Sequence, residues 1–155
     1  MGVSIKLEGI GQVDQIFKEL AAQIGDKKAN SKILVPAVRE AMRPVLAMAK
    51  SNAPVDTGTL QRTLQTEARR PTKRDRRSKY ITQTDTVIAI VTTAPAKKLK
   101  KLGIKSDARA IAQEFGSSRN PAHPYLRPAL ESQAQAVVNN LSTILARRLN
   151  DYKIK

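Results

Sequence analysis

Hydrophobic residues recur with a helical period in three long stretches of the chain. Apolar residues three or four positions apart between Val13 and Ile24 predict an amphipathic helix. The same spacing predicts a longer helix from about Asn30 to Asn52 and another from Leu126 to Tyr152. Proline fits the first turn of a helix but disrupts its interior, so Pro36 is compatible with a helix start, whereas Pro44 should kink or break the second helix.

Other stretches carry the pattern of strands. Apolar and polar residues alternate from Val3 to Leu7, which predicts a short half-buried strand. The run from Thr84 to Thr93 is rich in β-branched residues, and a Thr-rich run from Leu60 to Ala68 precedes it. We expect these two runs to pair as antiparallel strands across residues 69–83. The apolar run 110–116 fits either a strand or a single helical turn.

These elements predict an α+β fold, with a small antiparallel sheet, a long and kinked N-terminal helical region and a long C-terminal helix. A chain of 155 residues is long enough for one hydrophobic core, so we expect a single domain over residues 1–155. No run approaches the roughly 20 apolar residues that span a bilayer. The N-terminus shows no signal-peptide pattern, and we expect no membrane contact.

The charge is strongly unbalanced: 28 Lys and Arg against 13 Asp and Glu give a net charge of +15. Such a field attracts polyanions, including nucleic acid and acidic protein surfaces. The excess gathers in two basic loops, at about residues 69–83 and 96–108. The first has one acid, Asp75, among seven cations, and we expect mutual repulsion to keep its tip mobile. A solvated loop and a contact to DNA or an acidic partner are both open for these cations: Arg69, Arg70, Lys73, Arg74, Arg76, Arg77 and Lys79.

The sequence offers little for catalysis or cofactor binding. It has no Cys, its one histidine (His123) lies in a predicted loop, and neither GxGxxG nor a P-loop occurs. We therefore expect no metal, no cofactor and no catalytic residue. The tripeptide Asp56-Thr57-Gly58 is the one that aspartic proteases use, but it follows a helix end here instead of an apolar strand. A turn in which Gly58 takes a positive φ explains the same residues.

Three motifs in order resemble a known family. Ile5 to Ile10 reads as a strand ending in Glu-Gly before an amphipathic helix, and Ala53 to Leu60 (APVDTGTL) directly follows an Ala-rich helix. Ala112 to Gly116 (AQEFG) precedes Pro124 to Leu130 (PYLRPAL) at the start of the last helix. Together they resemble the phage tail-component family typified by gene product ten of a lambdoid coliphage, over nearly the whole chain. The very basic 69–79 segment and the Lys97–Lys105 segment depart from that resemblance.

The resemblance implies a structural protein of the phage neck or tail top, without enzymatic activity. It implies contacts with other neck and tail proteins and a homo-oligomeric ring in the virion, with a monomer in solution also open. Assembly would take place in the host cytoplasm. We expect the motif residues to shape turns and the start of the last helix; they are Asp56, Thr57, Gly58, Glu114, Phe115, Gly116, Pro124, Tyr125 and Pro128.

Two other functions remain open at the level of sequence. The charge of +15 suits a free-standing, nonspecific nucleic-acid-binding protein, whose affinity would fall steeply with salt. Within the assembly hypothesis, the cations of the first basic loop would meet either DNA in the channel or an acidic face of a neighbouring neck protein. An aspartic protease would lose a peptidase activity on Asp56→Asn, and we expect no such activity.

Overall fold

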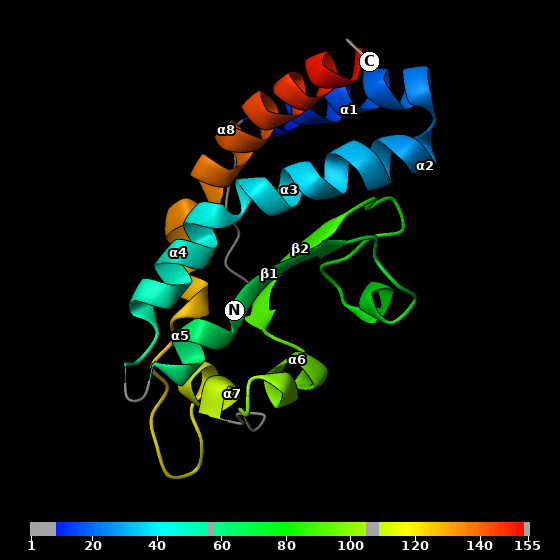
Figure 1. Ribbon diagram of the computed structural model, residues 1–155. Coiled ribbons are helices and arrows are strands. Elements are labelled where there is room, and N and C mark those ends of the chain that lie inside the picture. Colours follow the sequence, from blue (N-terminus) through cyan, green and yellow to red (C-terminus); the bar gives the residue numbers. More distant parts are fainter. Residues whose placement is uncertain (1–8, 56–57, 105–108, 154–155) are drawn as a thin grey trace. The chain divides into compact units, whose positions relative to one another are not determined.

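The computed structural model describes residues 9–55, 58–104 and 109–153 (Figure 1). These residues are mostly helical and carry one two-stranded sheet, formed by β1 (Leu64–Arg69) and β2 (Ile88–Thr93). Beyond the strand ends, the Ala94 N–H donates to the Thr63 carbonyl at 2.7 Å. The strands are antiparallel, so the predicted α+β class is confirmed.

The chain forms two compact units. Unit 1 takes residues 1–42, 67–90 and 135–155, and unit 2 takes residues 43–66 and 91–134. Both strands and the last helix, α8 (Leu126–Lys153), contribute residues to each unit.

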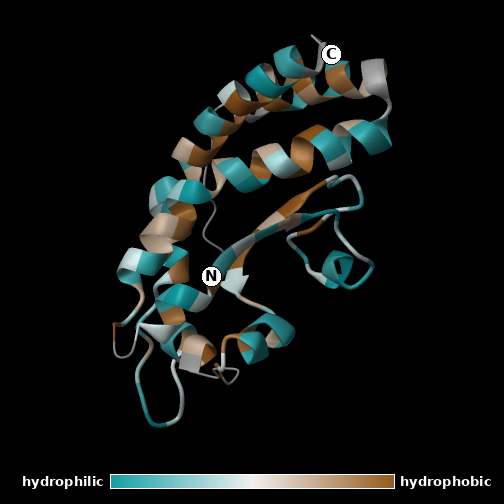
Figure 2. Ribbon diagram, in the orientation of Figure 1, coloured by the Kyte–Doolittle hydropathy of each residue, from teal (hydrophilic) through white to brown (hydrophobic). Residues whose placement is uncertain are grey.

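Unit 1 is built on helices near both ends of the chain. Its N-terminal helices are α1 (Ile10–Ile24), α2 (Asp26–Lys28), the π-helical η1 (Ala29–Leu34) and α3 (Val35–Ala41). Gly25 separates α1 from α2 with φ 83°, a backbone angle that favours glycine. Along α3 and the unit 1 part of α8, brown hydrophobic residues alternate with teal polar ones (Figure 2).

Small and branched apolar side chains form the core of unit 1. Half-buried residues of α1, among them Val13 and Phe17, pack against it. Strand β1 contributes Ala68 directly, and Ala89 of β2 and Val87, just before β2, pack at its margin. The buried members are Leu20, Ala29, Ile33, Leu34, Ala37, Val38, Ala68 and Leu145.

An ion-pair clamp holds α8 against α3 inside unit 1. The Glu40 carboxylate accepts Arg147 Nη2 at 2.7 Å on one oxygen and Arg148 Nη2 at 2.9 Å on the other. These hydrogen bonds, that from Arg147 foremost, lower the pKa of Glu40 from its ordinary value of 4.5. The clamp joins residues more than a hundred positions apart, so sequence periodicity could not have revealed it.

The two prolines of the long N-terminal helical region explain where it is interrupted. Pro36 lies in the first turn of α3, directly after η1, whose wider turn leaves room for a residue that has no N–H and crowds the preceding carbonyls. Helix α3 ends at Ala41, and α4 (Arg43–Asn52) restarts with Pro44 in its second position. The predicted break at Pro44 is confirmed.

The described residues of unit 2 form four short helices besides the start of α8. They are α4, α5 (Thr59–Thr63), α6 (Ala96–Lys101) and α7 (Arg109–Phe115). Its buried residues include Val45 and Ala49 of α4, Leu99 of α6 and Ala110 of α7. Residues 110–116 were expected to form either a strand or a helical turn, and α7 shows that a helix forms there.

The predicted strand from Leu60 to Ala68 is wrong over its first residues, which form α5. The Gln61 side chain explains the difference, because its Nε2 donates to the Lys50 carbonyl at 2.9 Å. That carbonyl is in the last turn of α4, where backbone acceptors have no partner within the helix. The tertiary contact thus favours a helical turn, and the strand starts only at Leu64.

The second strand is also shorter than predicted, because it begins at Ile88 and not at Thr84. The preceding backbone groups are used by side chains. The Thr86 carbonyl accepts Asn30 Nδ2 at 2.8 Å, and the Asp85 carbonyl accepts Arg76 Nη2 at 3.1 Å. The predicted helices over 13–24 and 126–152 are confirmed, whereas the predicted strand from Val3 to Leu7 lies outside the described residues.

Candidate functional site

The first basic loop connects β1 to β2 and is organised around its single acid. Asp75 Oδ1 accepts Arg69 Nη2 at 3.1 Å, and Oδ2 accepts the Thr72 backbone N–H at 2.7 Å and the Thr72 hydroxyl at 2.6 Å. Arg69 also donates to Glu67. Asp75 begins a single 3₁₀ turn, η2 (Asp75–Arg77). The loop thus has a local fold that is built on the bonds of Asp75, and the mobility expected of its tip stays a prediction.

These bonds shift the proton affinities of the two partners. The hydrogen bond from Arg69, followed by those from Thr72, holds the pKa of Asp75 well below its usual range. The hydrogen bond to Asp75, followed by that to Glu67, raises the pKa of Arg69. The negative charge of Asp75 is thus bound to partners inside the loop.

Two further cations of the loop bind backbone carbonyls. Arg76 donates to the carbonyls of Thr82 and Asp85. Arg70 Nη2 donates to the Asp26 carbonyl at 3.4 Å, which ties the loop to α2. We call Arg69, Arg70 and Arg76 the inner cations, because each makes hydrogen bonds that hold the loop.

The side chains of the other four cations of the loop are exposed, and none of these side chains makes a hydrogen bond or ion pair with the described part of the chain. We call them the outer cations; they are Lys73, Arg74, Arg77 and Lys79, all exposed. Lys79 Nζ lies 5.0 Å from the centre of the Tyr80 ring, which is itself 70% exposed. Figure 2 shows the short helix of this loop in teal, in line with its charge. The seven predicted contact residues therefore divide into two groups with different surroundings.

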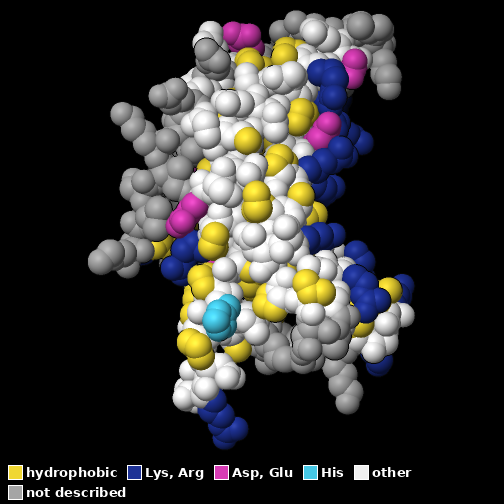
Figure 3. Space-filling model, turned by 90° about the vertical axis from the view of Figure 1, so that its left-hand side faces the viewer, with side chains coloured by type: hydrophobic (Ala, Val, Ile, Leu, Met, Phe, Trp, Pro, Cys, Tyr) yellow, Lys and Arg dark blue, Asp and Glu magenta, His cyan; other side chains and the backbone are white. Residues whose placement is uncertain are grey.

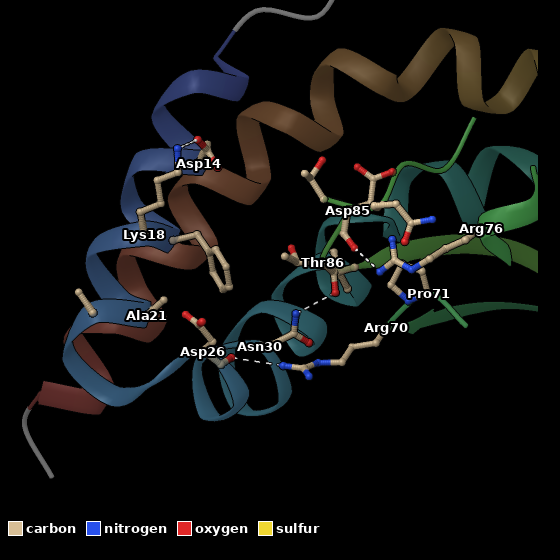
Figure 4. A pocket seen from close by; sticks show the side chains of 15 residues that line it. Asp14, Lys18, Ala21, Asp26, Asn30, Arg70, Pro71, Arg76, Asp85 and Thr86 are labelled. Carbon is tan, nitrogen blue, oxygen red and sulfur yellow. Dashed lines mark hydrogen bonds and ion pairs between the residues drawn. The ribbon is translucent and has the colours of Figure 1, made fainter. Parts of the chain in front are cut away.

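A pocket of about 1150 Å³ lies beside this loop in unit 1 (Figure 4). Residues of α1, α2 and η1 line one side, and residues 70–71, 76 and 83–87 line the other. Its charged groups are largely paired with the protein itself: Lys18 lies 2.7 Å from Asp14, and Arg70 and Arg76 bind carbonyls. The lining holds three acids and three bases, so the pocket has no net charge that would select a ligand.

A different motif is brought together in unit 2 at the start of α8. The Glu114 carboxylate, buried at the end of α7, accepts the backbone N–H groups of Tyr125 and Leu126 at 2.8 Å each and that of Arg127 at 3.1 Å. The first N–H groups of a helix have no partner within it, and an anion near that end also suits the helix dipole. Glu114 therefore caps α8 from a distance in sequence.

Two residues of the PYLRP motif complete this cap. Pro128 is the third residue of α8 and has no N–H, so it adds no donor that needs a partner. The Tyr125 side chain is 1% exposed, and its hydroxyl lies 3.4 Å from the Ala110 carbonyl of α7. Glu114, Tyr125 and Pro128, predicted from the sequence as motif residues, thus lie at one junction, whereas the Pro124 side chain is exposed beside it.

Gly116 ends α7 with φ 79° and donates to the Ala112 carbonyl at 2.7 Å. A Cβ at this position would lie 3.0 Å from the Ala122 backbone nitrogen, so only glycine fits both the angle and the space. Its neighbour Phe115 faces outward and is 68% exposed, as is Ile111 one turn earlier. The EFG motif thus places an acid inside and an aromatic ring outside.

The APVDTG motif is described only in part. Asp56 and Thr57 lie outside the described residues. Gly58 precedes α5 as its N-cap with φ 67°, which agrees with the positive φ expected there.

The second basic loop contains a short helix. Lys98, Lys100 and Lys101 lie in α6, and Lys98 Nζ donates to Gln65 Oε1 at 3.1 Å. Figure 2 shows α6 mostly in teal. Residues 105–108 of this segment are outside the described residues.

Nothing in the described residues forms a recognisable catalytic or metal centre. His123 lies on the surface (Figure 3, cyan) and its side chain is exposed, while its backbone N–H donates to the Gln113 carbonyl at 2.7 Å. Across residues 9–55, 58–104 and 109–153, no three His, Asp or Glu side chains gather closely enough to hold a metal ion. In the same ranges, every helix is too short or too polar to cross a membrane.

The chain was compared with known protein families, curated proteins and solved structures. Residues 14–116 match the family HK97-gp10-like, described as "Bacteriophage HK97-gp10, putative tail-component". No curated protein and no solved structure matches the chain. The match covers about two thirds of the sequence, from α1 to Gly116.

The chain belongs to this family of phage tail components. The resemblance inferred from the sequence motifs is thereby confirmed. The matched residues include the basic loop and Glu114, but not the turn of α8 that Glu114 caps.

Proposed function

We propose that this chain is a structural subunit of the phage neck or tail top, which joins or completes head and tail through protein–protein contacts. The observation that carries the proposal is the family match over residues 14–116. The subunit would act as one domain over residues 1–155, without catalysis or cofactor. It would be part of the virion after assembly in the host cytoplasm.

Exposed apolar side chains in unit 2 support a role in protein contacts. Ile111 and Phe115 follow each other by one helical turn on α7, and each is 68% exposed. Aromatic residues are enriched in protein interfaces, where a few of them carry much of the binding energy. We propose that this face of α7 meets a neighbouring neck or tail protein, or the next copy of a homo-oligomeric ring.

The test is a phage lacking this gene, complemented from a plasmid. We expect separate heads and tails, or incomplete tails, in electron micrographs of the deletion, and intact particles after complementation. Mass spectrometry of purified virions should detect the subunit. Infectious particles that form without the subunit would contradict the proposal.

The alternative function, a free-standing and nonspecific nucleic-acid-binding protein, rests on the charge of +15. Under this alternative, we expect the protein to be absent from purified virions. The same mass-spectrometry measurement therefore separates the two functions.

A further inference from the structure

The seven cations of the first basic loop fall into two groups, which differ in the bonds that their side chains make. The inner cations are bonded to Asp75, Glu67 and backbone carbonyls, so their charge is used for folding the loop. The side chains of the outer cations are exposed and make no hydrogen bond or ion pair with the described residues. From this division we infer that the outer cations are a binding surface for the phosphate backbone of duplex DNA, held in place by the inner ones.

The chemistry of the surface favours phosphates over an acidic protein face. Protein interfaces are centred on apolar and aromatic side chains, and they are depleted of Lys although enriched in Arg. Tyr80 is the one large hydrophobic side chain exposed between Arg70 and Val87. Duplex DNA instead presents about one negative charge per 1.7 Å of helix axis, which Lys and Arg neutralise without needing an apolar centre.

The state of Asp75 strengthens this reading. A free carboxylate among the outer cations would repel phosphate and weaken binding. Both oxygens of Asp75 are instead occupied by Arg69 and Thr72, and its side chain is only 17% exposed. The exposed surface of the loop from Lys73 to Lys79 is therefore of one sign.

Such a surface would be sequence-independent, because phosphates carry no base information. This inference deepens the proposed function by naming a partner of the subunit. It can fail alone: a protein that does not bind DNA can still be a virion component, and a DNA-binding protein can be absent from virions.

The experiment compares two variants of the full chain with equal net charge. The loop variant carries Lys73→Ala, Arg74→Ala and Arg77→Ala. The matched control carries Lys97→Ala, Lys100→Ala and Lys101→Ala, which are also exposed. Each loses three charges from +15, which gives +12. The probe is a short, fluorescently labelled random-sequence duplex, titrated at salt concentrations from about 50 to 200 mM.

We expect the slope of log K against log salt to be shallower by about 3 for the loop variant than for the wild type, since each phosphate contact contributes about 0.9. The control variant should stay near the wild-type slope. Circular dichroism should show that both variants are folded. Equal losses in the two variants would mean that net charge alone sets the affinity, and would overturn the inference.

Two more measurements test whether an acidic protein could be the partner and whether Asp75 holds the binding surface in place. Polyglutamate should displace the duplex poorly at equal charge concentration; efficient displacement would overturn the inference in favour of an acidic protein partner. Asp75→Ala raises the net charge by one but removes the partner of Arg69. We expect it to weaken DNA binding, because the outer cations lose their arrangement. Tighter binding by this variant, or no binding by the wild type, would also overturn the inference.

Discussion

The buried carboxylate of Glu114 accepts the backbone N–H of Tyr125 at 2.8 Å, eleven residues along the chain. This bond, with those to the next two N–H groups, joins the end of α7 to the start of α8. A side chain from another helix thus does what a local Ser or Asp usually does at a helix N-terminus. The two halves of the sequence motif, EFG and PYLRP, are parts of one capping device.

Glu114→Gln should lower the free energy of unfolding by about 1–3 kcal/mol. The variant replaces a carboxylate that serves three N–H donors with an amide that has one acceptor oxygen, so buried donors lose their charge-assisted bonds. Urea denaturation followed by circular dichroism measures the change. Glu131→Gln, an exposed position on α8, is the matched control and should change stability little.

Two glycines should respond to alanine in opposite directions. Gly116→Ala should destabilise the protein by at least about 1 kcal/mol, because alanine disfavours a φ of 79° and its Cβ would crowd the Ala122 backbone. Gly11→Ala in α1 should stabilise it by up to about 1 kcal/mol, since no atom lies within 4 Å of the added Cβ and alanine favours helix. Thermal melts of both variants test the pair. A stable Gly116→Ala protein would contradict the close approach at this turn.

The clamp between Glu40 and α8 should make stability depend on pH. The folded protein lowers the pKa of Glu40, so the clamp contributes fully above its unfolded value of 4.5 and is lost as the pH falls below it. Glu40→Gln should reduce the free energy of unfolding by about 1 kcal/mol at neutral pH and flatten its decline in acid. Urea titrations at a series of pH values measure this. Glu131→Gln keeps the clamp and should keep the acid-dependent loss.

Phe115→Ser should affect assembly more than folding. The ring is 68% exposed, so we expect the free energy of unfolding to change by no more than about 0.5 kcal/mol. If the α7 face meets a neighbour, complementation of the deletion phage should fall strongly. Val55→Ser, at a residue that is 72% exposed in the same unit, is the control. Full complementation by Phe115→Ser would remove α7 from the proposed interface.

The sequence predicted elements whose hydrophobic pattern is strong and local. The helices over 13–24 and 126–152 and the break at Pro44 were recognised because periodicity and proline act within a few residues. The prediction of a strand over Leu60–Thr63 was wrong, because the Gln61 side chain caps another helix. Local residue propensities carry no information about such a tertiary contact. Motif position alone identified Glu114 and Tyr125, but only the fold revealed that one binds the other.

In the basic loop, too, the sequence gives the number of charges but not their contacts. The seven cations looked equivalent, and their mutual repulsion suggested a mobile tip. A single acid, Asp75, recruits Arg69 and Thr72 and gives the loop its turn. The single acid in this basic run was the sequence feature that could have indicated a bonded turn. It would have suggested that some of the cations pair within the loop and others do not.

The division of labour in this loop leaves its outward-facing residues free to change during evolution. Since no side chain of an outer cation bonds to the turn that carries it, side-chain substitutions there, even to acidic residues, should be tolerated by folding. Related phages could therefore exchange the electrostatic character of this surface while retaining the same backbone. Diversity among relatives is then expected at Lys73, Arg74 and Arg77, with Asp75 and Arg69 kept as a pair.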